Sequence, residues 1–204
     1  MIRQFALAPV LALAMALPAA AEKLPLNTIS SYLNGMRTAQ AKFTQVNGDG
    51  SISTGTLYIK RPGRVRFEYD APEDTLVLAG SNTVAIFDGK SNTGPATYPL
   101  SRTPLSIILA DNVNLGQARM VTGHASDGKT TTVRAQDPEH PEYGNIQMVF
   151  SGPPVQLRQW VITDDSGSQT TVVLGDMKTG IGISDTNFNI EMAKSGRSQN
   201  RNSR

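Results

Sequence analysis

Apolar residues recur at every second position through residues 55–69, which Arg61-Pro62-Gly63 divides into two segments. In the second segment the charged residues Arg64, Arg66 and Glu68 take the positions between the apolar ones. A period of two predicts strands with one buried and one wetted face, here joined by a tight turn. The predicted apolar side of this hairpin carries Leu57, Ile59, Val65, Phe67 and Tyr69.

Two other stretches predict helices instead. Apolar residues spaced by three and four positions predict an amphipathic helix over residues 26–37, with Asn27 as its cap. Residues 103–110 begin with Thr-Pro, which is typical of a helix start, and then run apolar on nearly every side. A helix of that kind either is a buried connector or covers an apolar surface itself.

The rest of the chain is punctuated as an antiparallel β protein. Phe43 alternates with polar neighbours and precedes the turn residues 47–50, and short apolar alternations recur up to Leu174. Val155 and Leu157 share a side that Trp160 and Ile162 do not, which predicts a bulge near Arg158. No sequence repeat of twenty to fifty residues is visible, which makes a propeller or solenoid an unsuitable fold.

The N-terminal pattern predicts export. Arg3, a short apolar run and the small residues Ala19–Ala21 form the three parts of a secretory signal peptide, with cleavage expected after Ala21. We expect the remainder, 183 residues, to contain one domain over 22–193 and a tail over 194–204. The chain contains no cysteine, so we expect an exported protein that lacks disulfides and is not itself lipidated. No later segment is long and apolar enough for a transmembrane helix, so we expect the mature protein to be soluble.

The basic pI of about 9.0 comes from the two ends of the chain. Arg3 and the tail hold five of the 19 basic residues, which leaves 14 in the body against all 17 acidic residues. A body of negative net charge does not favour nucleic acid as a partner, and the polar, basic tail 194–204 is predicted to be disordered. We expect a monomer.

Candidate catalytic groups are few. The chain has no Gly-x-Ser-x-Gly elbow, and Gly48-Asp49-Gly50 lacks the third glycine of a dinucleotide-binding loop. His140 stands among carboxylates in residues 137–142, but two prolines make that stretch a stiff loop, and we expect a solvated acidic loop rather than a metal site. The sequence therefore predicts a binding protein that is not an enzyme and holds no metal or cofactor.

Several short motifs, in this order, resemble the family of periplasmic carriers of outer-membrane lipoproteins, the LolA type. They are Phe43-Thr44-Gln45, the Gly-x-Leu-x-Ile-x-Arg-Pro run from Gly55 to Pro62, the aromatic segment 65–69 with Ala71-Pro72, Thr103-Pro104, and Asp185-x-x-Phe188. The resemblance covers essentially the whole mature chain. It implies a mainly β (α+β) fold in which a curved, unclosed antiparallel half-barrel surrounds an apolar cavity and short helices form a lid.

The resemblance also implies roles for residues. The arginine of the Arg-Pro pair, Arg61, would hold the closed lid by its five donors, where the residues alone predict only a solvated charge at a strand end. Val65 and Phe67 stand where the family often carries larger apolar side chains, which bears on the shape of the cavity. The expected lid residues are Leu26, Ile29, Leu33, Met36, Pro104, Leu105, Ile107, Ile108 and Leu109. The expected lining of the acyl-chain cavity is Phe43, Leu57, Ile59, Val65, Phe67, Tyr69, Leu76, Leu78, Ile86, Ile146, Met148, Phe150 and Trp160.

The implied function is that of a periplasmic chaperone that takes acylated lipoproteins from the inner to the outer membrane. The implied partners are an ATP-driven lipoprotein-releasing complex of the inner membrane and an outer-membrane lipoprotein acceptor. Three alternatives remain open: a carrier of free lipid or glycolipid on the same fold, an envelope-stress module that senses detached lipoproteins, and an enzyme whose site the sequence does not reveal.

Overall fold

The computed structural model describes residues 22–91 and 93–202, so the predicted signal peptide lies outside the described residues. One antiparallel sheet of twelve strands dominates the fold. Its strands are β1 (Thr38–Val46), β2 (Ile52–Lys60), β3 (Arg64–Tyr69), β4 (Leu76–Gly80), β5 (Thr83–Phe87), β6 (Ala96–Pro99), β7 (Val121–Ser126), β8 (Thr130–Gln136), β9 (Asn145–Ser151), β10 (Gln156–Thr163), β11 (Gln169–Leu174) and β12 (Lys178–Thr179).

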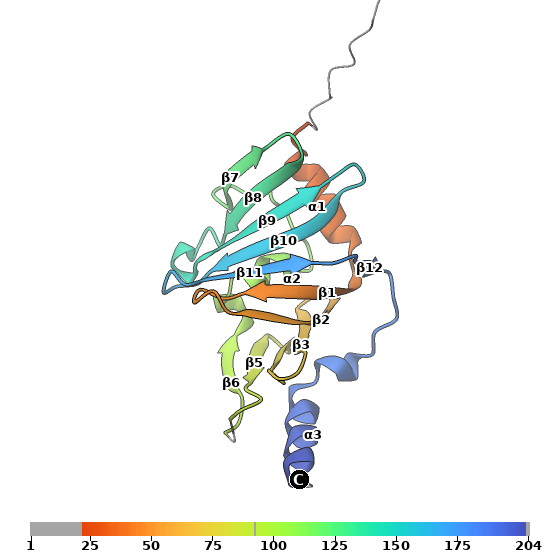
Figure 1. Ribbon diagram of the computed structural model, residues 1–204. Helices are drawn as coiled ribbons and strands as arrows, with labels where there is room; N and C mark the ends of the chain where they lie inside the picture. The colour runs from red at the N-terminus through yellow and green to blue at the C-terminus, as the bar shows by residue number, and fades with distance from the viewer. Residues whose placement is uncertain (1–21, 92, 203–204) are drawn as a thin grey trace, which may run out of the picture.

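The sheet consists of two meanders that meet at β1 (Figure 1). The path runs from β6 through β5, β4, β3 and β2 to β1, and then through β11, β10, β9 and β8 to β7, with the two-residue β12 pairing beside β1. Strands β6 and β7 are the two ends of this path and do not pair with each other. The structure therefore confirms the predicted mainly β, unclosed antiparallel fold.

Within the described residues, three α-helices and three short 3-10 helices complete the fold: α1 (Leu26–Gly35), α2 (Leu105–Leu109), α3 (Ile190–Asn202), η1 (Leu100–Arg102), η2 (Pro141–Tyr143) and η3 (Asp185–Phe188). Both helices predicted from periodicity are present, although neither begins with the predicted side-chain cap. Asn27 lies inside α1, and Thr103 donates its hydroxyl to the carbonyl of Leu100 at 2.9 Å. No helix of the described part of the chain is long and apolar enough to cross a membrane.

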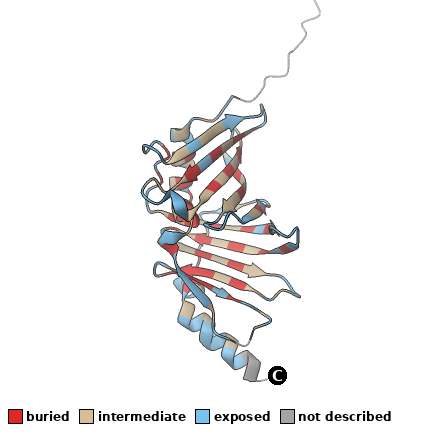
Figure 2. Ribbon diagram, turned by 90° about the vertical axis from the view of Figure 1, so that its left-hand side faces the viewer, coloured by how far each residue is buried: buried red, intermediate tan, exposed pale blue. Residues whose placement is uncertain are grey.

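The two faces of the sheet differ in their cover. We call inner face the side that carries Phe43, Leu57 and Phe67, because α1 and α2 pack against it in one apolar cluster. Buried residues alternate with less buried ones along most strands, as the bands in Figure 2 show. The predicted bulge is also present, as a register shift between Leu157 and Gln159.

Strand β4 corrects one part of the predicted cavity lining. Its Leu76 and Leu78 pair with Glu68 and Arg66, so the antiparallel register places both leucines on the opposite, outer face. There they form a second cluster with Phe188 and other residues of the C-terminal segment. The prediction failed because β4 is apolar on both faces, and alternation cannot then tell the inner face from the outer one.

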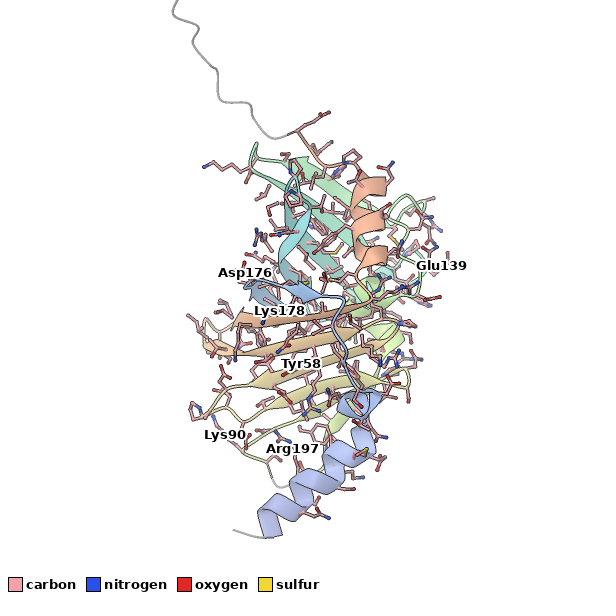
Figure 3. The ribbon with its side chains drawn as sticks, turned by 90° about the vertical axis from the view of Figure 1, so that its right-hand side faces the viewer. Tyr58, Lys90, Glu139, Asp176, Lys178 and Arg197 are labelled. Atoms are coloured by element: carbon pink, nitrogen blue, oxygen red, sulfur yellow. The ribbon has the colours of Figure 1, made fainter. Side chains whose placement is uncertain are left out.

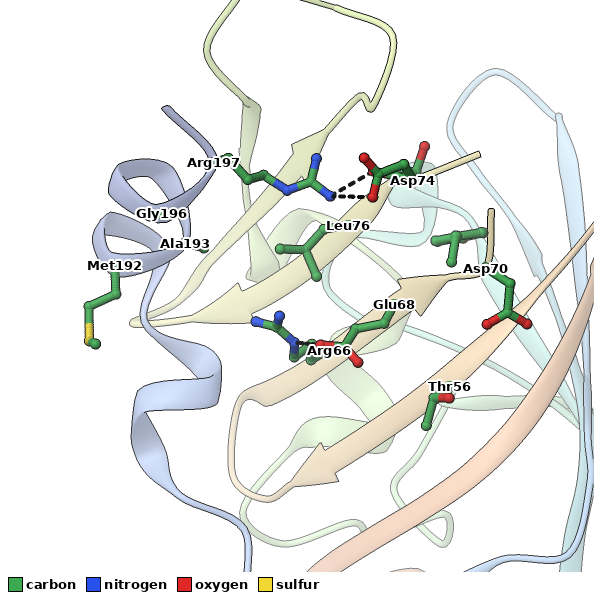
Figure 4. A pocket seen from close by; sticks show the side chains of 12 residues that line it. Thr56, Arg66, Glu68, Asp70, Asp74, Leu76, Met192, Ala193, Gly196 and Arg197 are labelled. Atoms are coloured by element: carbon green, nitrogen blue, oxygen red, sulfur yellow. Dashed lines mark hydrogen bonds and ion pairs between the residues drawn. The ribbon is translucent and has the colours of Figure 1, made fainter. Parts of the chain in front are cut away.

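The C-terminal segment also differs from the prediction, since residues 194–202, predicted to be disordered, continue helix α3. Ile190 and Ala193 of α3 pack on the outer-face cluster, and tertiary packing of one side stabilises a helix that its polar composition alone would not. Arg197 of α3, labelled in Figure 3, donates to the carbonyl of Asp74 at 2.6 Å (Figure 4). Its guanidinium also lies over the ring of Phe87. The tail is therefore helical as far as residue 202, and its contacts with the sheet reach Arg197.

Candidate functional site

The inner face brings most of the predicted cavity residues together. Phe43, Leu57, Ile59, Val65, Phe67, Ile146, Met148, Phe150 and Trp160 are all buried members of one cluster. Tyr69 packs against this cluster, and Ile86, which pairs with Val77 on the same face, is 37% exposed. The face is continuous across both meanders of the sheet, so it offers one extended apolar surface.

Gly55 leaves room for an aromatic row on this face. A Cβ atom at this position would overlap the carbonyl of Glu68 and lie 2.7 Å from the ring of Phe43. That ring makes edge contacts with Phe67 and Tyr69, with centroids 5.4 and 5.1 Å apart. The glycine of the Gly-x-Leu run therefore serves packing, since only a residue without a side chain permits this placement of Phe43.

Helices α1 and α2 cover the inner face with their own apolar side chains. The residues predicted for the lid contact the same cluster: Leu26 is partly buried, and Ile29, Leu33, Met36, Pro104, Leu105, Ile107, Ile108 and Leu109 are buried. Nearly every side chain of α2 is thus covered, which explains its uniformly apolar sequence. Together the two helices form a separate layer over the inner face.

Arg61 joins this layer to the sheet. Its side chain is only 4% exposed, and its guanidinium donates to the carbonyls of Leu33 in α1 and of Ala110 directly after α2. It also donates to Asn34 Oδ1 at 3.1 Å. Burial lowers the pKa of Arg61, with a further lowering from the nearby charge of Arg37, but a guanidinium keeps its proton in proteins. One buried cation therefore bridges both helices from the β2–β3 turn.

Backbone contacts of the same turn reinforce this junction. The amide of Arg61 donates to the carbonyl of Arg37 at 2.8 Å, and the amide of Gly63 donates to the carbonyl of Leu109 at 2.8 Å. The turn therefore contacts the chain just beyond the end of α1 and the last residue of α2. The carbonyl of Leu109 belongs to the last turn of α2, where acceptors have no partner within the helix.

Asn34 ties α1 to the segment that follows α2, and sequence reasoning did not identify it. Its amide group donates to the carbonyl of Val113 at 2.9 Å and accepts from the amide of the same residue at 2.8 Å. The exposed ion pair between Arg37 and Asp111, 3.0 Å apart, adds a weak contact between the same two segments. The two helices are thus joined to each other as well as to the sheet.

A separate contact fastens α1 to the meander that contains β10. The bulge in β10 frees the amide of Leu157, and this amide donates to the hydroxyl of Tyr32 at 3.1 Å. The Tyr32 ring also meets Phe150 edge-on, with centroids 6.1 Å apart. The bulge signal in the sequence located this contact site, although not its partner.

A pocket of about 410 Å³ opens on the inner face between the two meanders. Its apolar part includes Phe67, Ile86, Leu105 and Trp160. Its polar part includes Gln45, Asn47, Ser53, Tyr69, Glu73, Thr75 and Thr170. The volume lies within the usual range for sites that bind small molecules.

Hydrogen bonds organise the polar part of this pocket. Tyr69 donates its hydroxyl to Gln45 Oε1 at 2.6 Å, and Gln45 Nε2 donates to Asn47 Oδ1 at 2.6 Å. Burial raises the pKa of Tyr69 to about 12, so the hydroxyl keeps its proton and remains a donor at neutral pH. The pocket therefore has an apolar side and a polar, hydrogen-bonding side that also includes the carboxylate of Glu73.

The candidate metal loop is not organised as a ligand set. His140 lies 3.0 Å from Glu142 and stacks on the ring of Tyr143, with both its carboxylate partner and its own ring well exposed. Within residues 22–91 and 93–202, no three His, Asp or Glu side chains gather closely enough to hold a metal ion.

An unclosed sheet whose apolar inner face is covered by fastened helices defines a binding protein with an apolar interior. Comparison with protein families gives the particular class: residues 34–191 match the model of the family described as outer membrane lipoprotein carrier protein LolA. The chain belongs to this family.

Curated relatives agree with that assignment. An outer-membrane lipoprotein carrier protein of Azotobacter vinelandii is 23% identical over 183 residues, covering 86% of this chain and 87% of that protein. The carrier protein of Methylococcus capsulatus is 25% identical over 177 residues, covering 79% and 80%. Among solved structures, a LolA superfamily protein from Nitrosomonas europaea covers 83% of this chain and 98% of its own, at 11% identity and a TM-score of 0.39.

Proposed function

We propose that this protein is a periplasmic carrier that binds the acyl chains of lipoproteins against the inner face of its sheet. It would take them from an ATP-driven releasing complex of the inner membrane to an acceptor at the outer membrane. One observation carries the proposal: an extended apolar face is covered by two apolar helices that a single buried arginine fastens to the sheet. The family and the names of the relatives support the choice of cargo.

The energetics explain why such a cargo needs this interior. Burial of one methylene group contributes about 0.8 kcal/mol, so about fourteen methylenes of one acyl chain contribute on the order of 11 kcal/mol before other costs. The proposed lining is the predicted set without Leu76 and Leu78, which lie on the outer face. Release requires that part of this energy be offset.

Opening of the helical layer supplies that offset in our proposal. Chains can occupy the inner face only if Leu105 and its neighbours in α2 and α1 move away, which breaks the contacts of Arg61. Closed-state contacts therefore compete with the cargo. A protein with this balance binds acyl chains strongly enough to carry them and still gives them up to an acceptor.

Mass spectrometry of material that co-purifies with the protein from its native periplasm tests the proposal. Triacylated protein supports lipoprotein carriage, free lipid or glycolipid favours the lipid-carrier alternative, and a converted substrate favours an enzyme. Ile86→Asp places a charge in the pocket and is expected to reduce the recovered cargo. Ile52→Asp is the matched control, because Ile52 is 67% exposed, and recovery should be unchanged.

A further inference from the structure

Trp160 is a buried tryptophan whose indole N–H group has no hydrogen-bond partner in the described part of the chain, a combination that is rare in proteins. It is the only tryptophan of the chain and is 1% exposed, in the middle of β10 on the inner face. Its Nε1 is buried and finds no hydrogen-bond acceptor among the residues that the structure describes. Buried indole N–H groups usually have an acceptor, so this donor calls for a physical explanation.

The side chains around Trp160 do not offer an acceptor for this N–H group. Phe67 meets the indole edge-on with centroids 6.3 Å apart, and the pocket also presents Leu105, Val172 and Ile86. None of these side chains carries a lone pair that an N–H group could use. A phenylalanine would fill much of the same space without an unpaired donor.

The register of the sheet places Trp160 in line with the polar part of the pocket. Trp160 pairs with Val172, Val172 with Gln45, and Gln45 with Ser53, so the four residues form one row across the inner face. Neighbouring strands are about 4.8 Å apart, which puts Gln45 about 10 Å from Trp160. The row thus leads from an isolated donor in apolar surroundings to a hydrogen-bonded polar group.

We propose that Trp160 Nε1 donates a hydrogen bond to a carbonyl oxygen of the ester or amide that links an acyl chain to the cargo. This inference rests on the proposed function and adds a polar subsite to it. Acyl linkages are the acceptors that an acylated ligand brings into an apolar pocket, and the more polar part of the ligand then lies toward Gln45 and Tyr69. Trp160 would fix how far the chains enter.

A pair of matched lipids tests this subsite. Dioctanoylglycerol carries two ester carbonyls, whereas the dioctyl glycerol diether has the same chain length and none. In ¹⁵N-labelled protein the single tryptophan gives one indole N–H resonance, so no assignment is needed. The diester is expected to move that resonance downfield, and the diether should bind without a comparable downfield shift.

Variants provide the second readout. Trp160→Phe is expected to weaken binding of the diester by roughly 2- to 10-fold, the contribution of one hydrogen bond, and to leave the diether nearly unaffected. Phe67→Leu is the control, because it alters the same pocket and should weaken both lipids alike. Thermal unfolding verifies that each variant is folded. The NMR comparison of the two lipids uses the wild-type protein and does not depend on the variants.

The outcomes are distinct. If both lipids bind and shift the indole resonance equally, or if Trp160→Phe loses no preference for the diester, the subsite is refuted while the carrier function stands. If neither lipid binds, the proposed function fails and this inference fails with it.

Discussion

Arg61 lies in the β2–β3 turn, and its side chain contacts the ends of both covering helices, so replacing it by leucine removes these contacts. The leucine keeps an apolar volume at this position but leaves the carbonyls of Leu33 and Ala110 without their donor. Both carbonyls belong to helix ends, where no intrahelical partner is available. The variant therefore tests the closed state directly, with little change to the strands.

The size of the effect follows from these contacts. A hydrogen bond from a charged donor contributes about 1.5–3 kcal/mol, so the bonds to the three acceptors Leu33 O, Ala110 O and Asn34 Oδ1 contribute about 4.5–9 kcal/mol. Dehydration of the guanidinium, which is only 4% exposed, offsets several kcal/mol of this and leaves on the order of 2 kcal/mol. Since 1.4 kcal/mol is a factor of ten, the ratio of closed to open molecules should fall about thirtyfold.

Distance measurements between spin labels give the readout. The chain has no cysteine, so the substitutions Ser31→Cys on α1 and Gln156→Cys on β10 would introduce the only thiols that can react with the labels. Both positions are exposed. Arg61→Leu should broaden and lengthen the distance distribution, and Arg61→Lys should lie between it and the wild type, because lysine keeps the charge without the fork. Arg134→Leu, at an exposed arginine of β8, should change nothing. An unchanged distribution in Arg61→Leu would refute the role of Arg61 in closure.

Three further changes have defined outcomes. Asn34→Ala loses both hydrogen bonds to Val113 and should lower the free energy of unfolding by about 1–3 kcal/mol in a denaturant titration. An unchanged free energy of unfolding would show that those bonds do not stabilise the fold. Gly55→Ala forces a Cβ atom against the ring of Phe43 and should cost about 1–3 kcal/mol by the same titration. The pKa of Asp185 is lowered mainly by a lysine hydrogen bond, so its stabilisation is present above the unfolded pKa of about 3.9 and is lost as the pH falls through the folded pKa. The wild type should accordingly melt above Asp185→Asn at pH 7, and equal melting at that pH would contradict this.

The sequence specified the hairpin of β2 and β3 well because charged and apolar residues alternate strictly there. It failed at β4, where residues 76–79 are apolar on both faces and only the register with β3 separates them. The C-terminal helix was also missed, since its composition is polar and its stability comes from contacts with distant strands.

In the candidate site, too, some features follow from local sequence patterns and others depend on residues that are distant in the chain. The apolar lining and the covering helices could be predicted because periodicity reveals which residues need burial. The partners of Arg61 lie 27 to 50 residues away in the chain, and no local pattern indicates them without a related family. Asn34 and the unpaired Trp160 donor depend on three-dimensional neighbours alone, which places them beyond any pattern of spacing.

The free ends of the sheet have a mechanical consequence. Because β6 and β7 share no ladder, the interior is bounded by a sheet with two free edges, rather than by a closed ring of hydrogen bonds. A closed barrel fixes its bore by strand number and stagger, but a sheet with two free edges can splay there without breaking a strand pair. In the proposed carrier, the capacity of the interior would therefore depend on how far the two free edges move apart, which would let one protein fit ligands of different width.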